Sequence, residues 1–451
     1  MAMIDDVPIH LRGNWAPVSD ERTLTDLPVI GSIPRELDGV YIRNGANPIT
    51  GMSDHPFIGD GMVHGMRLRD GSAEWYRNRY VKTPFISDPD RPVIDVDQSL
   101  MDMTSSKANT NVVGHGGLIL ALEEGHFPYV LDGLLETVGP TDFGGRLTGP
   151  FTAHPKICPD TGEMIAFGYS FLEPYLTYHR VAADGTLVQS ERITIGGPVM
   201  MHDFNITRNH VIIMDLPAVF DLDLALRGEM PITWKADYPA RLGVMPRDGS
   251  DADVRWFDID PCYVFHPMNA YERGTDIIII DVARLPHIWR DSPTDFPPPM
   301  LYRWTIDTAK GEVREEQVDD LAAEFPRVAD SVVGKQHRYG YMLANATEAA
   351  FADPAGTAGA IVKYDRQTGE RHSIELGLGR MAGESAFVAA DNSAAEDDGY
   401  LMTYVHDTAT NTSEFAIFDA GSMSNEPIAA VPLPRVPFGF HGNWIPSAVI
   451  G

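Results

Sequence analysis

Four histidines, widely separated in the chain, lie in similar short motifs and are the residues best suited to chemistry. They are His154 in TAHPK, His202 in MMHDF, His266 in YVFHPMN and His441 in GFHGNW. Because their spacing is so wide, no single helix or hairpin can present more than one of them. A fold that gathered all four imidazoles would form an all-nitrogen site, which suits iron, copper, zinc or nickel and not magnesium or calcium.

An ordinary structural role is the alternative for these histidines. The chain contains 15 His, and several are expected near strand ends as polar core residues. Wide spacing is weaker evidence for a metal site than a compact motif such as HExxH. Spacing alone therefore favours the structural role, and the fold has to decide between the two.

The composition is that of a globular protein with a large core, at 43% apolar and 22% charged residues over 451 positions. Two cysteines, Cys158 and Cys262, argue against a secreted domain that depends on disulfides, so buried reduced thiols are expected. The N-terminus lacks a basic region followed by an apolar run, and no apolar stretch is long enough to span a membrane. We therefore expect a cytoplasmic protein.

Acidic side chains outnumber basic ones by 64 to 35, which gives a formal net charge of −29. Such a field repels phosphate backbones and anionic lipid surfaces, so nucleic acid is excluded as a partner. Peripheral contact with a membrane through a neutral apolar patch, for substrate uptake, stays open. No obligate protein partner is indicated.

Short β-rich runs separated by turn signals dominate the chain. Asp-Gly and similar pairs between such runs predict hairpins. Turns are expected at Asp70-Gly71, Asp160-Thr161-Gly162, Asp184-Gly185, Lys310-Gly311 and Thr368-Gly369, with another hairpin over 399–420. This pattern predicts a large antiparallel β structure, most naturally a β-propeller, although no strict repeat allows the blades to be counted.

We expect residues 1–451 to form one domain, with partly helical connections around 130–150 and 217–245 that cap one end of the β structure. In a propeller, the innermost strand of each blade lines a central axis, so one histidine from each of four inner strands would meet there. His154 and His266 each precede a proline, which favours the extended backbone of such strands. The wide spacing is then a consequence of the fold, and the balance moves toward a metal site.

Short motifs along the whole chain resemble those of the carotenoid cleavage oxygenases, a family with stilbene-cleaving and apocarotenoid-cleaving members. In order, the motifs are GNWAPV (13–18), ELDGVYIRNGANP (36–48), GDGMVHG (59–65), KANTNVV (107–113), LEEGHFPY (122–129), TAHPK (152–156), MHDFNIT (201–207), FHP (265–267), EFPRV (324–328), GESAFV (383–388) and GFHGNW (439–444). The resemblance implies a seven-bladed β-propeller with a partly helical dome over a non-haem Fe(II).

The resemblance also implies roles for individual residues. The iron ligands would be His154, His202, His266 and His441. Metal-bound histidines usually donate their far N–H to an acceptor, which fixes the orientation of the ring. By resemblance, Glu124, Glu324 and Glu384 would accept from His202, His266 and His441 respectively, which leaves His154 without such a partner.

Residues near the open coordination positions are expected to include Thr110, Phe265 and Phe440, although ordinary strand and core packing is an alternative for each. One departure from the family bears on the substrate. Stilbene-cleaving relatives carry a lysine directly before the first of these glutamates, where Glu123 stands here. A carboxylate cannot serve as the cationic partner of a phenolate, which favours a carotenoid or apocarotenoid.

Together these observations predict an Fe(II)-dependent dioxygenase that uses O2 to split a carbon–carbon double bond of a carotenoid or apocarotenoid into two carbonyl products. Cleavage of a stilbene or phenylpropene by the same chemistry is an alternative. A non-catalytic β-propeller interaction module is an alternative from a different class, and it needs no metal. A structural zinc protein would require Cys ligands, and two Cys are too few.

Overall fold

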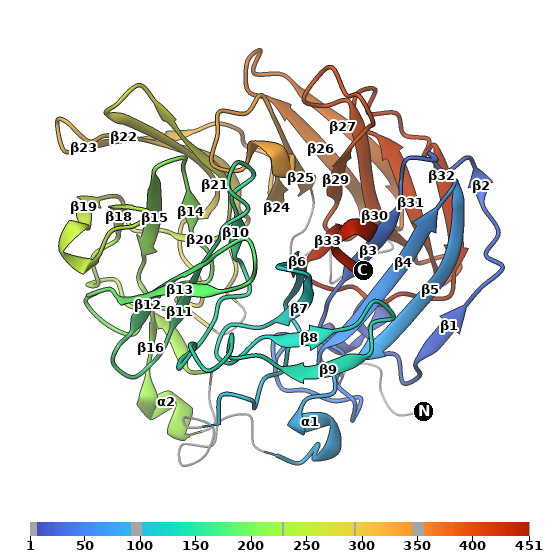
Figure 1. Ribbon diagram of the computed structural model, residues 1–451, viewed down its shortest axis with the longest axis horizontal. Helices are drawn as coiled ribbons and strands as arrows, with labels where there is room; N and C mark the ends of the chain where they lie inside the picture. The colour runs from blue at the N-terminus through green and yellow to red at the C-terminus, as the bar shows by residue number, and fades with distance from the viewer. Residues whose placement is uncertain (1–6, 92–101, 228–229, 293–294, 345–355, 451) are drawn as a thin grey trace. The chain divides into compact units, whose positions relative to one another are not determined.

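The computed structural model describes residues 7–91, 102–227, 230–292, 295–344 and 356–450 (Figure 1). The chain divides into two compact units. Unit 1 comprises Met1–Gly144, Glu348–Lys363 and Arg371–Gly451, and unit 2 comprises Gly145–Thr347 and Tyr364–Glu370. Both units consist mainly of antiparallel sheets, so strand pairing determines where each functional side chain lies.

Unit 1 contains a five-stranded sheet built from both ends of the chain. The last strand, β33 (Gly442–Pro446), pairs with β3 (Gly39–Arg43) near the N-terminus (Figure 1). The sheet order is β1-β5-β4-β3-β33, with β1 (Arg22–Leu24), β4 (Met62–Arg69) and β5 (Ser72–Tyr80). This pairing anchors the segment that directly precedes β33 to the N-terminal part of the chain.

Two more sheets belong to unit 1. One has the order β2-β32-β31-β30-β28, with β2 (Ile30–Gly31), β32 (Ala429–Leu433), β31 (Thr412–Asp419), β30 (Gly399–Asp407) and β28 (Arg380–Ala382), and with β29 (Ala386–Ala389) also paired to β30. The other follows sequence order, with β6 (Asn111–His115), β7 (Leu118–Leu122), β8 (Tyr129–Leu131) and β9 (Thr137–Pro140).

Unit 2 contains three four-stranded sheets. The first is β10 (Lys156–Ile157), β11 (Met164–Tyr169), β12 (Leu176–Val181) and β13 (Leu187–Arg192). The second is β14 (Asn205–Ile206), β15 (His210–Asp215), β18 (Arg241–Pro246) and β19 (Arg255–Asp258). The third is β20 (Tyr263–Arg273), β21 (Ile277–Leu285), β22 (Met300–Asp307) and β23 (Glu312–Gln317).

One further four-stranded sheet takes strands from both units, and the remaining elements are short. The shared sheet is β24 (Ala323–Arg327), β25 (Tyr339–Ala344), β26 (Ala358–Asp365) and β27 (Arg371–Leu378). A two-stranded sheet is formed by β16 (Ala218–Phe220) and β17 (Ile232–Trp234). Within the described ranges, the α-helices are α1 (Pro84–Ser87), α2 (Leu222–Leu226) and α4 (Ser447–Ile450), and the 3₁₀ turns are η2 (Ile9–Leu11), η3 (Gly13–Trp15), η4 (Asp251–Asp253) and η5 (Asp330–Val332).

Among the described residues, seven sheets have four or more strands, and these are the blades of a seven-bladed β-propeller. The fold class predicted from the sequence is therefore confirmed. Each turn predicted from a pair of turn residues joins two consecutive antiparallel strands, as Asp70-Gly71 does for β4 and β5 and Lys310-Gly311 does for β22 and β23.

Burial differs between strands of different blades. In unit 1, every residue of β3 is buried, whereas β23 of unit 2 alternates between exposed and partly buried positions. Alternation of this kind marks a strand with one face in water, and continuous burial marks a strand covered on both faces. Within unit 2, apolar side chains such as Leu242, Ile280 and Trp304 pack together between the second and third sheets.

The two connections expected to be partly helical differ from each other. Within 217–245 the chain forms α2 together with β16 and β17, so this segment is partly helical. Within 130–150 it forms β8, β9 and turns, and no helix is present. The expected helix is wrong there because the segment pairs as a hairpin, and such pairing overrides local preference.

Two general predictions can also be compared with the structure. Cys158 and Cys262 are both free and buried, as expected for reduced thiols. In the described part of the chain, no helix combines the length and the apolar character needed to cross a membrane.

The hairpin turns give a test of the fold. Gly311 has φ +76°, and an added Cβ would meet no atom within 4 Å, so the effect of Gly311→Ala is backbone strain alone. We expect this substitution to lower the free energy of unfolding by about 1 kcal/mol, measured as a lower urea midpoint. Gly149→Ala is the control, because that site is equally open and lacks a positive φ. Equal shifts for the two variants would contradict this account.

Candidate metal centre

Each of the four histidines lies in or just before a strand at one edge of a sheet. His154 precedes β10 and His202 precedes β14, while His266 lies inside β20. His441 directly precedes β33. These four strands are terminal in their sheets, so each sheet offers one imidazole at its edge.

Unit 2 brings three of the histidines together. The ring centroids of His154 and His202 are 4.4 Å apart, and those of His202 and His266 are 5.1 Å apart. The Nε2 atoms of His202 and His266 face each other at 3.3 Å. Two ring nitrogens at this distance require a proton or a cation between them, because lone pairs facing each other repel.

Glu324 fixes the ring of His266. Its Oε2 accepts a hydrogen bond from Nδ1 of His266 at 2.7 Å and another from the amide of Phe325 at 2.5 Å. Phe325 stacks on His266 with ring centroids 5.3 Å apart, and its φ of +53° is unusual for a bulky residue. This turn directs both the carboxylate and the aromatic ring at one imidazole, and it leaves Nε2 of His266 free of the carboxylate.

His441 has a comparable setting within unit 1. Its Nδ1 lies 3.2 Å from Oε1 of Glu384, while Oε2 of Glu384 accepts from the amide of Gly442 at 2.9 Å. The backbone of His441 is held on both sides, because its amide donates to the carbonyl of Thr110 and its carbonyl accepts from the amide of Asn44. Glu384 is buried, with 3% of its surface exposed.

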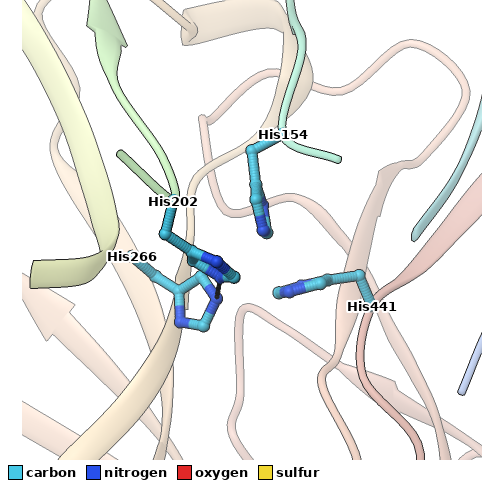
Figure 2. A group of neighbouring side chains, drawn as sticks. All are labelled: His154, His202, His266 and His441. Carbon is cyan, nitrogen blue, oxygen red and sulfur yellow. Dashed lines mark hydrogen bonds between the residues drawn. The ribbon is translucent and has the colours of Figure 1, made fainter. Parts of the chain in front are cut away.

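The nitrogen atoms that the four histidines offer as ligands lie within 4.8 Å of one another (Figure 2). Nitrogens bound to one first-row metal at about 2.1 Å are about 3.0 Å apart at right angles and about 4.2 Å apart when opposite. The spread of the group is slightly larger than these values, so a small inward movement of the rings would let all four bind one cation. An all-imidazole donor set also has the softness that iron, copper, zinc and nickel prefer.

His154 has a carboxylate neighbour that sequence reasoning did not identify. Oδ2 of Asp203 lies 3.8 Å from Nδ1 of His154, and both residues are buried. Asp203 stands beside His202 in the MHDF motif, but nothing in that motif indicates which ring it approaches. Only the fold relates these two segments of unit 2.

Glu124 lies just beyond β7 and is partly buried, and its pairing with His202 stays a prediction. The preceding residue, Glu123, is already engaged locally. Its Oε1 accepts from Nδ1 of His126 at 2.5 Å and from the amide of Gly125 at 3.0 Å. Burial lowers the pKa of His126, but the charge and hydrogen bond of Glu123 outweigh it, so the pKa is raised above its usual value.

The three residues expected near the open coordination positions lie beside histidines or their supports. Thr110 accepts from the amide of His441 through its carbonyl. Phe265 contacts the ring of His202 edge-on at 5.1 Å, and it also packs against other aromatic rings of unit 2. Phe440 contacts Phe57, with ring centroids 5.8 Å apart.

Comparison with known proteins decides the family. Residues 15–446 match the family described as "Retinal pigment epithelial membrane protein". A carotenoid cleavage oxygenase of Mycobacterium tuberculosis is 40% identical, and the match covers 97% of each chain. The carotenoid 9,10(9',10')-cleavage dioxygenase 1 of Arabidopsis thaliana is 36% identical over 97% of this chain and 90% of that protein. This chain belongs to the carotenoid cleavage oxygenase family.

Solved structures agree with this assignment. The crystal structure of Pseudomonas brassicacearum lignostilbene dioxygenase has a TM-score of 0.86 and 28% identity, covering 98% of this chain and 99% of that one. Cobalt-substituted Synechocystis ACO has a TM-score of 0.82 and 27% identity, covering 96% and 97%. As a carotenoid cleavage oxygenase, the chain is an enzyme that cleaves an alkene with oxygen.

Two glycines near His441 and Glu384 test how the centre is positioned. A Cβ on Gly439 would lie 2.7 Å from the carbonyl oxygen of Asn44 and would also collide with Arg43, whereas a Cβ on Gly383 would meet only Oγ1 of Thr403 at 3.8 Å. Gly439→Ala must therefore shift the segment that leads to His441. We expect it to weaken metal binding by at least about tenfold, as loss of a metal's supporting contacts does.

Gly383→Ala is the matched control and should bind metal like the wild type. Dissociation constants from chelator competition measure both variants, with circular dichroism to check folding. Wild-type affinity in a folded Gly439→Ala protein would contradict the positioning account.

Proposed function

We propose that the chain is a non-haem Fe(II) dioxygenase that cleaves one carbon–carbon double bond of a carotenoid or apocarotenoid to give two carbonyl products. One observation carries the proposal, namely the group formed by His154, His202, His266 and His441 in a chain of the carotenoid cleavage oxygenase family. These four residues would hold the iron, which when bound would supply the activation of O2 for cleavage of the alkene.

The buried glutamates determine how two of the imidazoles bind. A carboxylate oxygen only accepts, so Glu324 and Glu384 place the ring proton of His266 and His441 on Nδ1 and leave Nε2 to ligate. Negative charges nearby also offset the charge of a divalent ion among neutral ligands. Fe(II) bound there would supply the activation of O2, so no side chain need act as a general acid or base.

Aromatic side chains would keep water away from the centre. Phe265 covers His202, and Phe325 covers His266, each with ring centroids just over 5 Å from the imidazole. Phe265 is itself buried against Tyr263 and Phe296. Walls of this kind fit an extended apolar substrate and position it without using charge.

The substrate class is proposed from the relatives and from Glu123. The relatives that are 40% and 36% identical are named for carotenoid cleavage. Glu123 pairs with His126, so this position offers no free cation to a phenolate. The second candidate is cleavage of a stilbene or phenylpropene, which is favoured by the TM-score of 0.86 to a lignostilbene dioxygenase.

We also propose that the enzyme works in the cytoplasm and takes its apolar substrate through peripheral contact with a membrane. Because the net charge is −29, such contact would depend on apolar side chains rather than on attraction to anionic lipids. Leu222 and Leu226 on α2 are exposed and would suit it.

Removal of a single ligand tests the metal centre. We expect wild-type protein to bind about one iron per chain, and His266→Ala or His154→Ala to lose both iron and turnover. His179→Ala is the control, because His179 is a buried histidine of unit 2 that bonds to Ser190 through Nδ1. Iron analysis after desalting and oxygen uptake with substrate measure the outcome. A ligand variant with full iron and full turnover would remove that histidine from the centre.

Substitution of Glu123 tests the substrate class. We expect the wild type to prefer a long polyene to a hydroxystilbene, and Glu123→Lys to raise the hydroxystilbene-to-polyene ratio. Because the new lysine would lie beside His126, the double variant Glu123→Lys/His126→Gln should show the larger gain. A competition assay with both substrates, read by product mass, measures the ratio. Wild-type protein that cleaves hydroxystilbenes and ignores polyenes would refute the substrate assignment and leave the metal centre intact.

A further inference from the structure

We propose that Asp203 is a positioning residue that orients His154 through Nδ1 of its ring and thereby sets the affinity of the centre for a divalent metal. This inference rests on the proposed metal centre. It concerns the one histidine for which the sequence and the family resemblance supply no carboxylate partner. His154, Asp203 and Lys156 all belong to unit 2.

The ring of His154 is oriented like those of His266 and His441, although its carboxylate lies farther away. Asp203 Oδ2 lies 3.8 Å from Nδ1 of His154. For comparison, Nδ1 of His266 lies 2.7 Å from Oε2 of Glu324, and Nδ1 of His441 lies 3.2 Å from Oε1 of Glu384. Three of the four imidazoles therefore turn Nδ1 toward a buried carboxylate, which leaves Nε2 of each for a shared ion.

The carboxylate of Asp203 is held firmly in place. Lys156 Nζ lies 2.7 Å from Oδ1 and 3.0 Å from Oδ2, and the amide of Phe204 donates to Oδ1 at 2.6 Å. Asp203 is only 3% exposed, so it cannot turn toward water. The backbone of His154 is also fixed, because its amide donates to Oγ1 of Thr152 at 2.9 Å. The carboxylate of Asp203 therefore cannot move away without breaking other bonds.

The effect should be weaker than that of Glu324. A separation of 3.8 Å exceeds the range of a direct hydrogen bond, so Asp203 acts on the ring N–H mainly as a nearby charge. The positive charge of Lys156, which is paired with Asp203, further weakens the attraction between this carboxylate and the ring N–H. We therefore expect a contribution at the lower end of the roughly 10–100-fold range typical of residues that support metal ligands.

The test measures binding of Co(II) and Fe(II) to the full-length apo protein by chelator competition, together with the visible absorption spectrum of the Co(II) form. Asp203→Asn should raise both dissociation constants about tenfold and change the Co(II) spectrum, because the orientation of His154 changes. Asp215→Asn is the control. Asp215 is also a buried, ion-paired carboxylate of unit 2, but it bonds to Tyr238 and Arg241. Asp215→Asn should lower the stability of the protein and leave the metal dissociation constants and the Co(II) spectrum unchanged.

A second variant separates the role of the carboxylate from that of the ion pair. Lys156→Met keeps Asp203 and removes its cation, so metal affinity should be unchanged or higher. Wild-type affinity and spectrum in Asp203→Asn would overturn the inference, as would equal losses in Asp203→Asn and Asp215→Asn. If Asp203→Asn does not fold, a tenfold loss of affinity in Lys156→Met overturns it instead. Wild-type protein that binds neither metal would refute the proposed centre itself, which is a distinct outcome.

Discussion

The proposed centre depends on one interaction, in which a buried carboxylate accepts the Nδ1 proton of an imidazole. A neutral histidine carries one ring proton, and the partner of one nitrogen decides which nitrogen is left to ligate. Glu324 makes this choice for His266 and Glu384 makes it for His441. Both glutamates also accept a neighbouring backbone amide, so the carboxylates themselves have little freedom. In the proposed centre, the orientation of these two histidines would therefore be set by groups that do not touch the metal.

Strand pairing brings these groups together. The pairing of β3 with β33 ties the first part of the chain to the last. Just before β33, His441 continues this pairing, because its carbonyl accepts from the amide of Asn44 and its amide donates to the carbonyl of Thr110. Backbone hydrogen bonds on both sides thus fix the main chain of His441, independently of its side chain. In unit 2, a bulge after Glu324 and the left-handed backbone of Phe325 interrupt β24 where the carboxylate must turn inward. Such irregularities are typical of functional sites.

Sequence patterns predicted the hairpins well, because a turn such as Asp70-Gly71 is determined by a few adjacent residues. They also singled out the four histidines, although the motifs shared with the family were needed to separate these from the other His. Local patterns did not predict contacts between distant segments, and the expected pairs of Glu324 with His266 and Glu384 with His441 came from the family resemblance alone. No local pattern relates Asp203 to His154, or indicates that Phe325 would stack on His266. The helix predicted around 130–150 was wrong for the same reason, because the structure of this segment is determined by strand pairing.

Charge balance explains why Asp203 differs from the glutamates. Glu324 and Glu384 are paired with histidines, and Glu124 is the predicted partner of a third. Three carboxylates already exceed the charge of one divalent ion with four neutral ligands. A further buried anion without its own cation would be costly, because an uncompensated charge in a protein interior is strongly destabilising. Lys156 compensates Asp203 at 2.7 Å. The fourth histidine can then have a carboxylate beside it without adding net negative charge to the centre.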